Sequence, residues 1–142
     1  LYVDHYVKFD NKRETKRYNV DMCSRISVFN EYNYPIKKDI KFYVKDLSLG
    51  GLYGIIPKKN IEDIDDRYPL SFQLNTDSVS AVNFDAEIIR ISDRELSYEV
   101  AVKFKYMTDE NAKILESVIR KLENDTGSHL VKYLVKGERI KL

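Results

Sequence analysis

Two short segments of the sequence carry side chains that could bind a nucleotide. Arg13 and Arg17 are four positions apart, and Asp46, Ser48 and Gly51 follow within one tight turn further along the chain. A guanidinium can pair with two phosphate oxygens, or with O6 and N7 of guanine, through parallel hydrogen bonds. A carboxylate can accept from N1 and N2 on the opposite edge of guanine. The combination suits a ligand that contains both phosphates and guanine rings, and it predicts a nucleotide receptor.

The two segments differ in how specific they are. The pattern RxxxR is weak by itself, because Arg90 and Arg94 form a second, incidental copy. The pattern (D/N)xSxxG, which residues 46–51 match, is expected only about 0.05 times by chance in a chain of this composition. Taken separately, the first segment would be a solvated basic linker and the second an ordinary hairpin connection. Their order and spacing favour one joint binding site.

RxxxR followed by (D/N)xSxxG, in this order and about this far apart, resembles the signature of the PilZ domain. PilZ domains are bacterial receptors for the second messenger cyclic di-GMP. Residues 86–91, residues 98–104 and the helical pattern after them are similar to the second half of that fold. The resemblance therefore covers roughly residues 12–124. Ala101 stands where many members have glycine, which implies a modest packing change and no altered ligand contact.

The resemblance also implies which residues bind cyclic di-GMP. Arg13 and Arg17 match the arginines that wrap the ligand from a flexible N-terminal segment, and we expect them at phosphates and guanine Hoogsteen edges. Asp46 and Ser48 match the guanine-binding turn. Gly51 matches the position at which the backbone approaches the base closely. Candidates for secondary contacts are Lys12, Gly50 and Arg90.

The composition is that of an ordinary globular chain with a single domain. Its 142 residues are 43% hydrophobic and 33% charged, which is enough to form a core. The formal net charge of +1 creates no overall field that would demand DNA or an anionic membrane, so an anion site must be local. Cys23 is the one cysteine, which excludes an internal disulfide and fits a reducing cytoplasm. The sequence shows no membrane-spanning apolar run and no signal peptide.

Hydrophobic periodicity predicts a mainly β fold. Six segments alternate apolar and polar residues as half-buried strands do, namely 18–24, 40–44, 52–56, 68–74, 82–91 and 98–104. In the fifth segment the alternation changes parity between Ile88 and Ile89, which predicts a β-bulge. Six strands with short turns and no helix between them favour an antiparallel β-barrel, which the resemblance makes a split barrel.

The C-terminal part changes to a helical period. Leu115, Val118, Ile119 and Leu122 form one apolar stripe, and the pattern predicts a helix over 108–124. Residues 128–135 fit a second short helix that Gly137 would end, with apolar positions that cover the core or meet a partner. The chain begins with Leu rather than Met, so we expect a module of a longer protein. The expected organisation is a linker or the end of a preceding domain over 1–11, a PilZ-like domain over 12–124, and a helical extension over 125–142.

Patterns for catalysis and metal binding are missing from the sequence. It contains no nucleophile elbow, Walker loop or zinc pattern. His5 and His129 are far apart, and neither forms a ligand-spaced set with Cys23. The acidic segment 62–66 lacks the ligand spacing of a calcium loop and is interpreted as a solvated turn. We therefore expect no enzyme activity, no cofactor and no bound metal.

The hypothesis from the sequence is a bacterial, cytoplasmic signalling protein. It would bind cyclic di-GMP and pass a conformational change to an N-terminal domain or a protein effector, with no membrane partner. One alternative is a PilZ-like protein-interaction module with weak or no nucleotide binding. The other is a barrel that binds single-stranded RNA through exposed Tyr and Lys side chains. The near-neutral charge argues against the RNA alternative.

Overall fold

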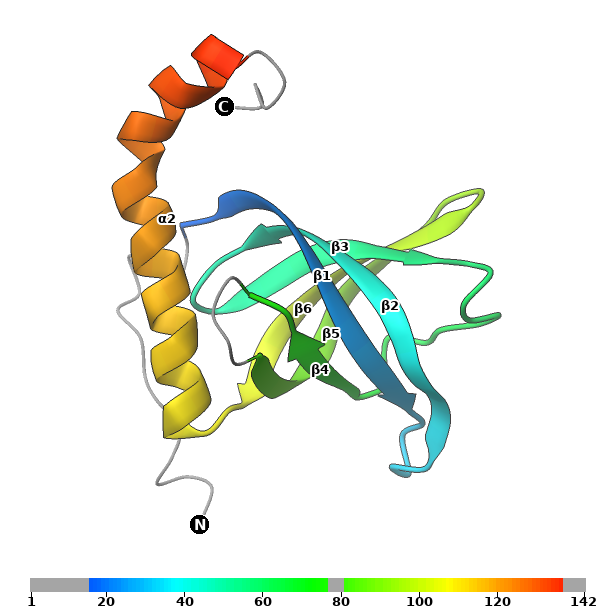
Figure 1. The fold of residues 1–142 in the computed structure, drawn as a ribbon. Coiled ribbons are helices and arrows are strands. Elements are labelled where there is room, and N and C mark those ends of the chain that lie inside the picture. The colour runs from blue at the N-terminus through cyan, green and yellow to red at the C-terminus, as the bar shows by residue number, and fades with distance from the viewer. Residues whose placement is uncertain (1–15, 77–80, 137–142) are drawn as a thin grey trace.

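The computed structural model describes residues 16–76 and 81–136 (Figure 1). Its elements are β1 (Tyr18–Phe29), β2 (Pro35–Leu47), β3 (Gly51–Pro57), β4 (Leu70–Leu74), β5 (Val82–Asp93), β6 (Ser97–Tyr106) and α2 (Asp109–Lys136). The strands pair antiparallel in the order β1-β2-β3-β6-β5-β4, and β4 pairs with β1 to close a barrel. This confirms the predicted six-stranded antiparallel barrel.

Apolar side chains fill the inside of the barrel. Phe42, Phe72, Phe84 and Phe104, from four different strands, form a chain of ring contacts with centroids 5.0, 4.9 and 4.6 Å apart. All four side chains are buried. A small barrel packed in this way has no room for a ligand in its lumen. A binding site for a molecule as large as a dinucleotide must therefore lie on the outer surface or at a rim.

The parity change in the fifth segment is a β-bulge, as predicted. Ile88 pairs with Val102 on β6, whereas Arg90 pairs with the very next residue, Ala101. Ile89 is the additional residue, and its side chain is 57% exposed. After the bulge, Ile91 again packs against the core. The bulge consequently turns Arg90 to the outer face of the barrel.

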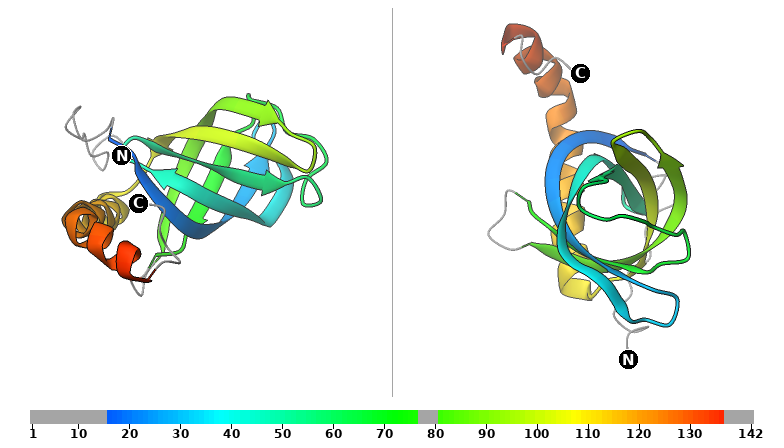
Figure 2. Two further views of the ribbon diagram at one scale, coloured as in Figure 1. Left: turned by 90° about the horizontal axis from the view of Figure 1, so that it is seen from above. Right: turned by 90° about the vertical axis from the view of Figure 1, so that its right-hand side faces the viewer.

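The helix α2 lies against one end of the barrel (Figures 1 and 2). Leu115 and Ile119 are fully buried, and Asn111 near its start accepts from Asn83 N on β5 at 2.9 Å. The separate second helix predicted for 128–135 is wrong, because α2 runs without a break from Asp109 to Lys136. Gly127 costs a helix about 1 kcal/mol relative to alanine but keeps its backbone hydrogen bonds, so it does not end the helix. Within the described part of the chain, no helix has the length and apolar character needed to cross a membrane.

The hairpin of β1 and β2 projects from the end of the barrel opposite to α2 (Figure 1). Both strands are longer than the sequence pattern indicated, since β1 continues to Phe29 and β2 starts at Pro35. The missed start of β2 lies in the run 31–39, which is all exposed, and an exposed segment has no burial pattern that could reveal a strand. The missed end of β1 does alternate, with Ile26 and Val28 buried.

Candidate functional site

The turn between β2 and β3 is held together by the side chain of Ser48. Its Oγ donates to the carbonyl of Gly51 at 3.1 Å and accepts from the backbone N–H groups of Gly50 and Gly51 at 3.2 and 3.1 Å. The backbone N–H of Ser48 also donates to the Gly51 carbonyl, at 2.9 Å. Ser48 is only 1% exposed. Its hydroxyl is thus occupied in shaping the turn.

The two glycines of this turn lie against β6. An added Cβ on Gly51 would stand 2.1 Å from the carbonyl oxygen of Val102, far inside van der Waals contact. The carbonyl of Gly50 accepts from Phe104 N at 3.0 Å. Glycine is therefore required at position 51 by the close approach of two strands, which is a different reason from the backbone–base approach that the resemblance implied.

An ion pair joins the two predicted motifs. Nη1 of Arg17, directly before β1, lies 2.5 Å from Oδ1 of Asp46, near the end of β2. The side chains are 46% and 23% exposed, so part of each charged group faces solvent. The structure therefore brings Arg17, Asp46, Ser48 and Gly51 together at one end of the barrel. Lys12 and Arg13 lie outside the described residues.

Strand pairing extends this site across the outer face of the barrel. Asn19 pairs with Asp46, Asp46 with Tyr53, Tyr53 with Ala101, and Ala101 with Arg90. Directly paired residues share a face of a sheet, and neighbouring strands are about 4.8 Å apart, so this row spans about 19 Å. Arg90, the candidate for a secondary contact, hence lies in the same row as Asp46. Ala101 is the shortest side chain between the long ones of Tyr53 and Arg90.

A polar network that the sequence did not indicate stands beside this row. The hydroxyl of Tyr53 donates to Glu99 Oε1 at 2.8 Å, and Arg94 contacts both carboxylate oxygens of Glu99 at 3.2 Å. The hydrogen bond from Tyr53, followed by that from Arg94, lowers the pKa of Glu99. Donation to Glu99 in turn raises the pKa of Tyr53. Tyr53 lies on β3, Glu99 on β6 and Arg94 in the turn between β5 and β6, so only the strand register could have revealed the network.

Acidic residues do not assemble into a metal site in the described part of the chain. No group of three or more His, Cys, Asp or Glu side chains is placed to hold an ion there. At the β2–β3 turn, the side chains of Arg17 and Asp46 offer charge pairing and hydrogen bonding. Here a guanidinium and a carboxylate lie side by side, and a tyrosine and a further arginine point outward on the same face. Such a set of groups can recognise an anionic, hydrogen-bonding ligand.

Comparisons with known proteins agree with this architecture. The family model for the PilZ domain matches residues 11–121, most of the chain, and the chain therefore belongs to the PilZ domain family. Comparison with curated protein sequences gave no match.

Solved structures with the same fold are distant in sequence. The chain is similar to the PilZ domain with c-di-GMP of YcgR from Escherichia coli, at a TM-score of 0.61 and 18% identity over 82% of this chain and 95% of that one. It is also similar to the MrkH–c-di-GMP complex of K. pneumonia, at a TM-score of 0.55 and 13% identity over 78% of this chain and 51% of that one. A third similar structure is the PlzA protein of Borreliella burgdorferi in complex with c-di-GMP, at a TM-score of 0.51 and 14% identity over 82% of this chain and 54% of that one. At these identities the likeness shows the fold alone, and the chain spans about half the length of the two longer proteins.

Proposed function

We propose that this chain is a non-enzymatic receptor for cyclic di-GMP. The observation that carries the proposal is the ion pair between Arg17 and Asp46, which joins the ends of the two predicted motifs on an accessible face. Arg17 would donate to a phosphate or to the Hoogsteen edge of a guanine, and Asp46 would accept from N1 and N2 of a guanine. Membership in the PilZ family and three structural relatives described with c-di-GMP support this ligand.

Breaking the ion pair between Arg17 and Asp46 costs a ligand little binding free energy. Pairs between solvent-exposed side chains contribute only about 0–1 kcal/mol, because water solvates the separated charges well. A ligand that supplies phosphates to Arg17 and guanine donors to Asp46 replaces one charge-assisted contact by several. The pair thus keeps both groups near their working positions at little cost in binding free energy.

The remaining candidate residues take different roles in this proposal. Ser48 and Gly51 act through the shape of the turn, because their contacts are with backbone. Gly50 shares that role, because its carbonyl accepts a hydrogen bond from Phe104 N on β6. Arg13, four positions before Arg17, would provide the second guanidinium, and Lys12 and Arg90 would add weaker contacts at the edges.

A route for passing the signal starts next to Arg17. The hydroxyl of the following residue, Tyr18, donates to Glu123 of α2 at 2.9 Å. A ligand that repositions Arg17 therefore acts one residue away from a contact between the barrel and the helix. We propose that binding biases this contact and the segment before Arg17, and so reports to a neighbouring domain or a protein effector in the bacterial cytoplasm.

Isothermal titration calorimetry with cyclic di-GMP tests the proposal. We expect the unmodified chain to bind, and Arg17→Ala and Asp46→Ala to weaken binding about thirtyfold each, since each loses a charge-assisted contact of about 2 kcal/mol. Arg90→Ala should have a smaller effect. Arg67→Ala is the matched control, because Arg67 also forms ion pairs, with Asp65 and Glu31, but sits beside the hairpin at the opposite end.

Two results would contradict the assignment. If the folded chain takes up no cyclic di-GMP, the interaction-module hypothesis replaces the receptor. If Arg17→Ala and Asp46→Ala bind as well as Arg67→Ala, a nucleotide binds elsewhere on the domain and the β2–β3 turn is not its site.

A further inference from the structure

The tip of the β1–β2 hairpin presents apolar side chains to solvent. Tyr32 is 75% exposed, Tyr34 68% and Ile36 40%, which makes three of the five large exposed hydrophobic residues in the described part of the chain. They stand within the exposed run 31–39. Large apolar side chains gathered in one exposed segment indicate an interaction surface more often than scattered ones do. The proposed function above makes no use of them.

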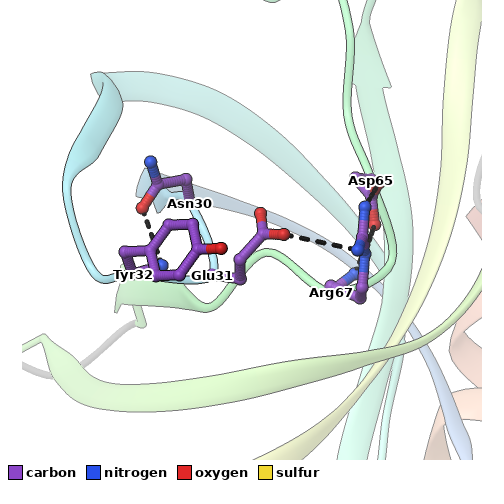
Figure 3. Close-up of polar contacts among 5 residues, drawn as sticks. All are labelled: Asn30, Glu31, Tyr32, Asp65 and Arg67. Carbon is purple, nitrogen blue, oxygen red and sulfur yellow. Dashed lines mark hydrogen bonds and ion pairs between the residues drawn. The ribbon is translucent and has the colours of Figure 1, made fainter.

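The turn that carries these side chains is well ordered by hydrogen bonds. Oδ1 of Asn30 accepts from the backbone N–H groups of Tyr32 and Tyr34 at 2.9 and 3.0 Å, and Asn30 N donates to the Tyr34 carbonyl at 2.8 Å. Asn33 adopts a positive φ of 68°. Glu31 reaches Arg67 at 3.3 Å, and Arg67 pairs with Asp65, which ties the hairpin to the loop before β4 (Figure 3). The backbone that carries the two tyrosines is therefore ordered before any partner arrives, which lowers the entropy cost of binding.

The hairpin also offers positive charge. The two carboxylates of its exposed run 31–39 are neutralised by arginines, since Glu31 pairs with Arg67 and Asp39 with Arg25 at 2.8 Å. Lys37 and Lys38 are exposed, and no carboxylate among the described residues lies within ion-pair distance of either. We call the surface formed by these side chains the hairpin patch, and its members are Tyr32, Tyr34, Ile36, Lys37 and Lys38. The hairpin patch combines apolar area with two exposed ammonium groups.

A complementary acidic surface lies in the neighbouring loop between β3 and β4. Ile61 and Ile64 are 4% and 7% exposed and anchor this loop in the core, while Glu62 and Asp63 between them are exposed. The hydroxyl of Tyr98 donates to the Glu62 carbonyl at 2.9 Å and fixes the backbone there. Within the described chain, no lysine or arginine forms an ion pair with either carboxylate.

We propose that the hairpin patch binds a second copy of this chain, with Lys37 and Lys38 of each copy facing Glu62 and Asp63 of the other. The hairpin and the acidic loop are neighbours in one molecule, joined by the Glu31–Arg67 pair and by Phe29 N donating to the Pro69 carbonyl at 3.0 Å. A two-fold axis between them brings each patch against the partner's loop in two equivalent contacts. A membrane or nucleic acid suits this end less well, because Glu62 and Asp63 would face an extended polyanion. The contact is small, so the dimer forms at high protein concentration.

Sedimentation equilibrium from about 10 µM to about 1 mM tests the proposal. We expect the average mass to rise with concentration, and the association to weaken in about 0.5 M salt because exposed charges are screened. The double variant Lys37→Glu/Lys38→Glu should lower the association constant at least about tenfold, as should Glu62→Lys/Asp63→Lys. Tyr32→Ser/Tyr34→Ser should lower it as well. Ile89→Ser, which removes a 57% exposed apolar side chain on β5, outside both the patch and the acidic loop, is the matched control and should leave it unchanged.

Mixing the two charge-reversed variants gives the sharpest result. In the mixed dimer one contact joins the reversed hairpin to the reversed loop, and the other joins the two unmodified surfaces, so both contacts are attractive. We expect association to return to the unmodified level in the mixture alone. A chain that stays monomeric up to about 1 mM, or a dimer that is insensitive to both reversals, overturns the proposal. Circular dichroism of each variant confirms that the barrel is folded, and none of these outcomes depends on nucleotide binding.

Discussion

The residues of the DxSxxG pattern divide into two roles. Asp46 carries charge to an accessible face and pairs with Arg17, whereas Ser48 and Gly51 contact backbone within the turn and on β6. The pattern specifies residue types and spacing, so it could predict a charged group beside a tight turn. It could not predict that the serine hydroxyl is fully engaged, because that depends on the path of the backbone around it.

Gly51→Ala tests the structural role of this glycine. The added Cβ would stand 2.1 Å from the Val102 carbonyl oxygen, and backbone on both strands would have to move. We expect the free energy of unfolding to fall by more than about 3 kcal/mol, as for other severe steric conflicts in a packed core. Urea unfolding measures it, with Leu96→Ala as a control that should stay within about 0.5 kcal/mol. Equal stability of the two variants would show that β3 and β6 can separate locally.

Among the elements, those with one buried face were predictable and those without were not. The bulge in β5 could be predicted because burial imposes parity on both sides of Ile89. The outer half of β2 is exposed and shows no strand pattern in the sequence. The outer half of β1 does alternate and buries Ile26 and Val28, so its end was predictable although the predicted strand stopped at residue 24. The end of α2 was misjudged, since the apolar stripe predicted a helix over 108–124 and a separate one over 128–135, whereas α2 continues to Lys136.

The contact between β1 and α2 supports a prediction at this scale. Tyr18→Phe removes a hydrogen bond from a buried ring to the carboxylate of Glu123 while keeping the ring. Because the acceptor is charged and partly accessible, we expect the free energy of unfolding to fall by about 1–2 kcal/mol. Hydrogen exchange in the described turns of α2 should accelerate as the helix loosens from the barrel.

Tyr34→Phe is the control for that experiment, because it removes a hydroxyl from a ring that is 68% exposed at the opposite end of the barrel. It should change neither stability nor exchange in α2. If Tyr18→Phe behaves like Tyr34→Phe, the hydroxyl of Tyr18 contributes nothing to docking the helix, and the route from Arg17 to α2 loses its first step.

At the scale of the whole molecule, two surfaces occupy opposite ends of one barrel. The β2–β3 turn lies near α2, the hairpin patch lies at the far end, and β2 spans the distance between them (Figure 1). Its 13 residues allow a separation of up to about 40 Å. The sequence pointed to the first surface through its motifs. It could not point to the second, because the lysines and the acidic loop become neighbours only when β1, β2 and the segment before β4 meet in the closed barrel.

Charge pairs distributed over the molecule set its response to acid. Hydrogen bonds from Arg25, Arg67 and Tyr53 lower the pKa of Asp39, Asp65 and Glu99 respectively, the last with help from Arg94. A carboxyl group whose pKa is lower in the folded chain stabilises the fold above its unfolded pKa of about 4, and that contribution is lost as the pH falls through the folded pKa. Partial desolvation raises the pKa of Asp85, so this group acts in the opposite direction.

Urea unfolding between about pH 7 and about pH 2.5 should therefore show stability that declines below about pH 4. Glu99→Gln should flatten the decline, because the neutral side chain binds no proton and has no acid-sensitive contribution to lose. Asp85→Asn should steepen it, because it removes a group whose protonation is favoured in the folded chain. The two variants thus change the slope in opposite directions although each replaces a carboxylate by an amide. Equal slopes in both variants and the unmodified chain would mean that acid sensitivity resides in other carboxylates.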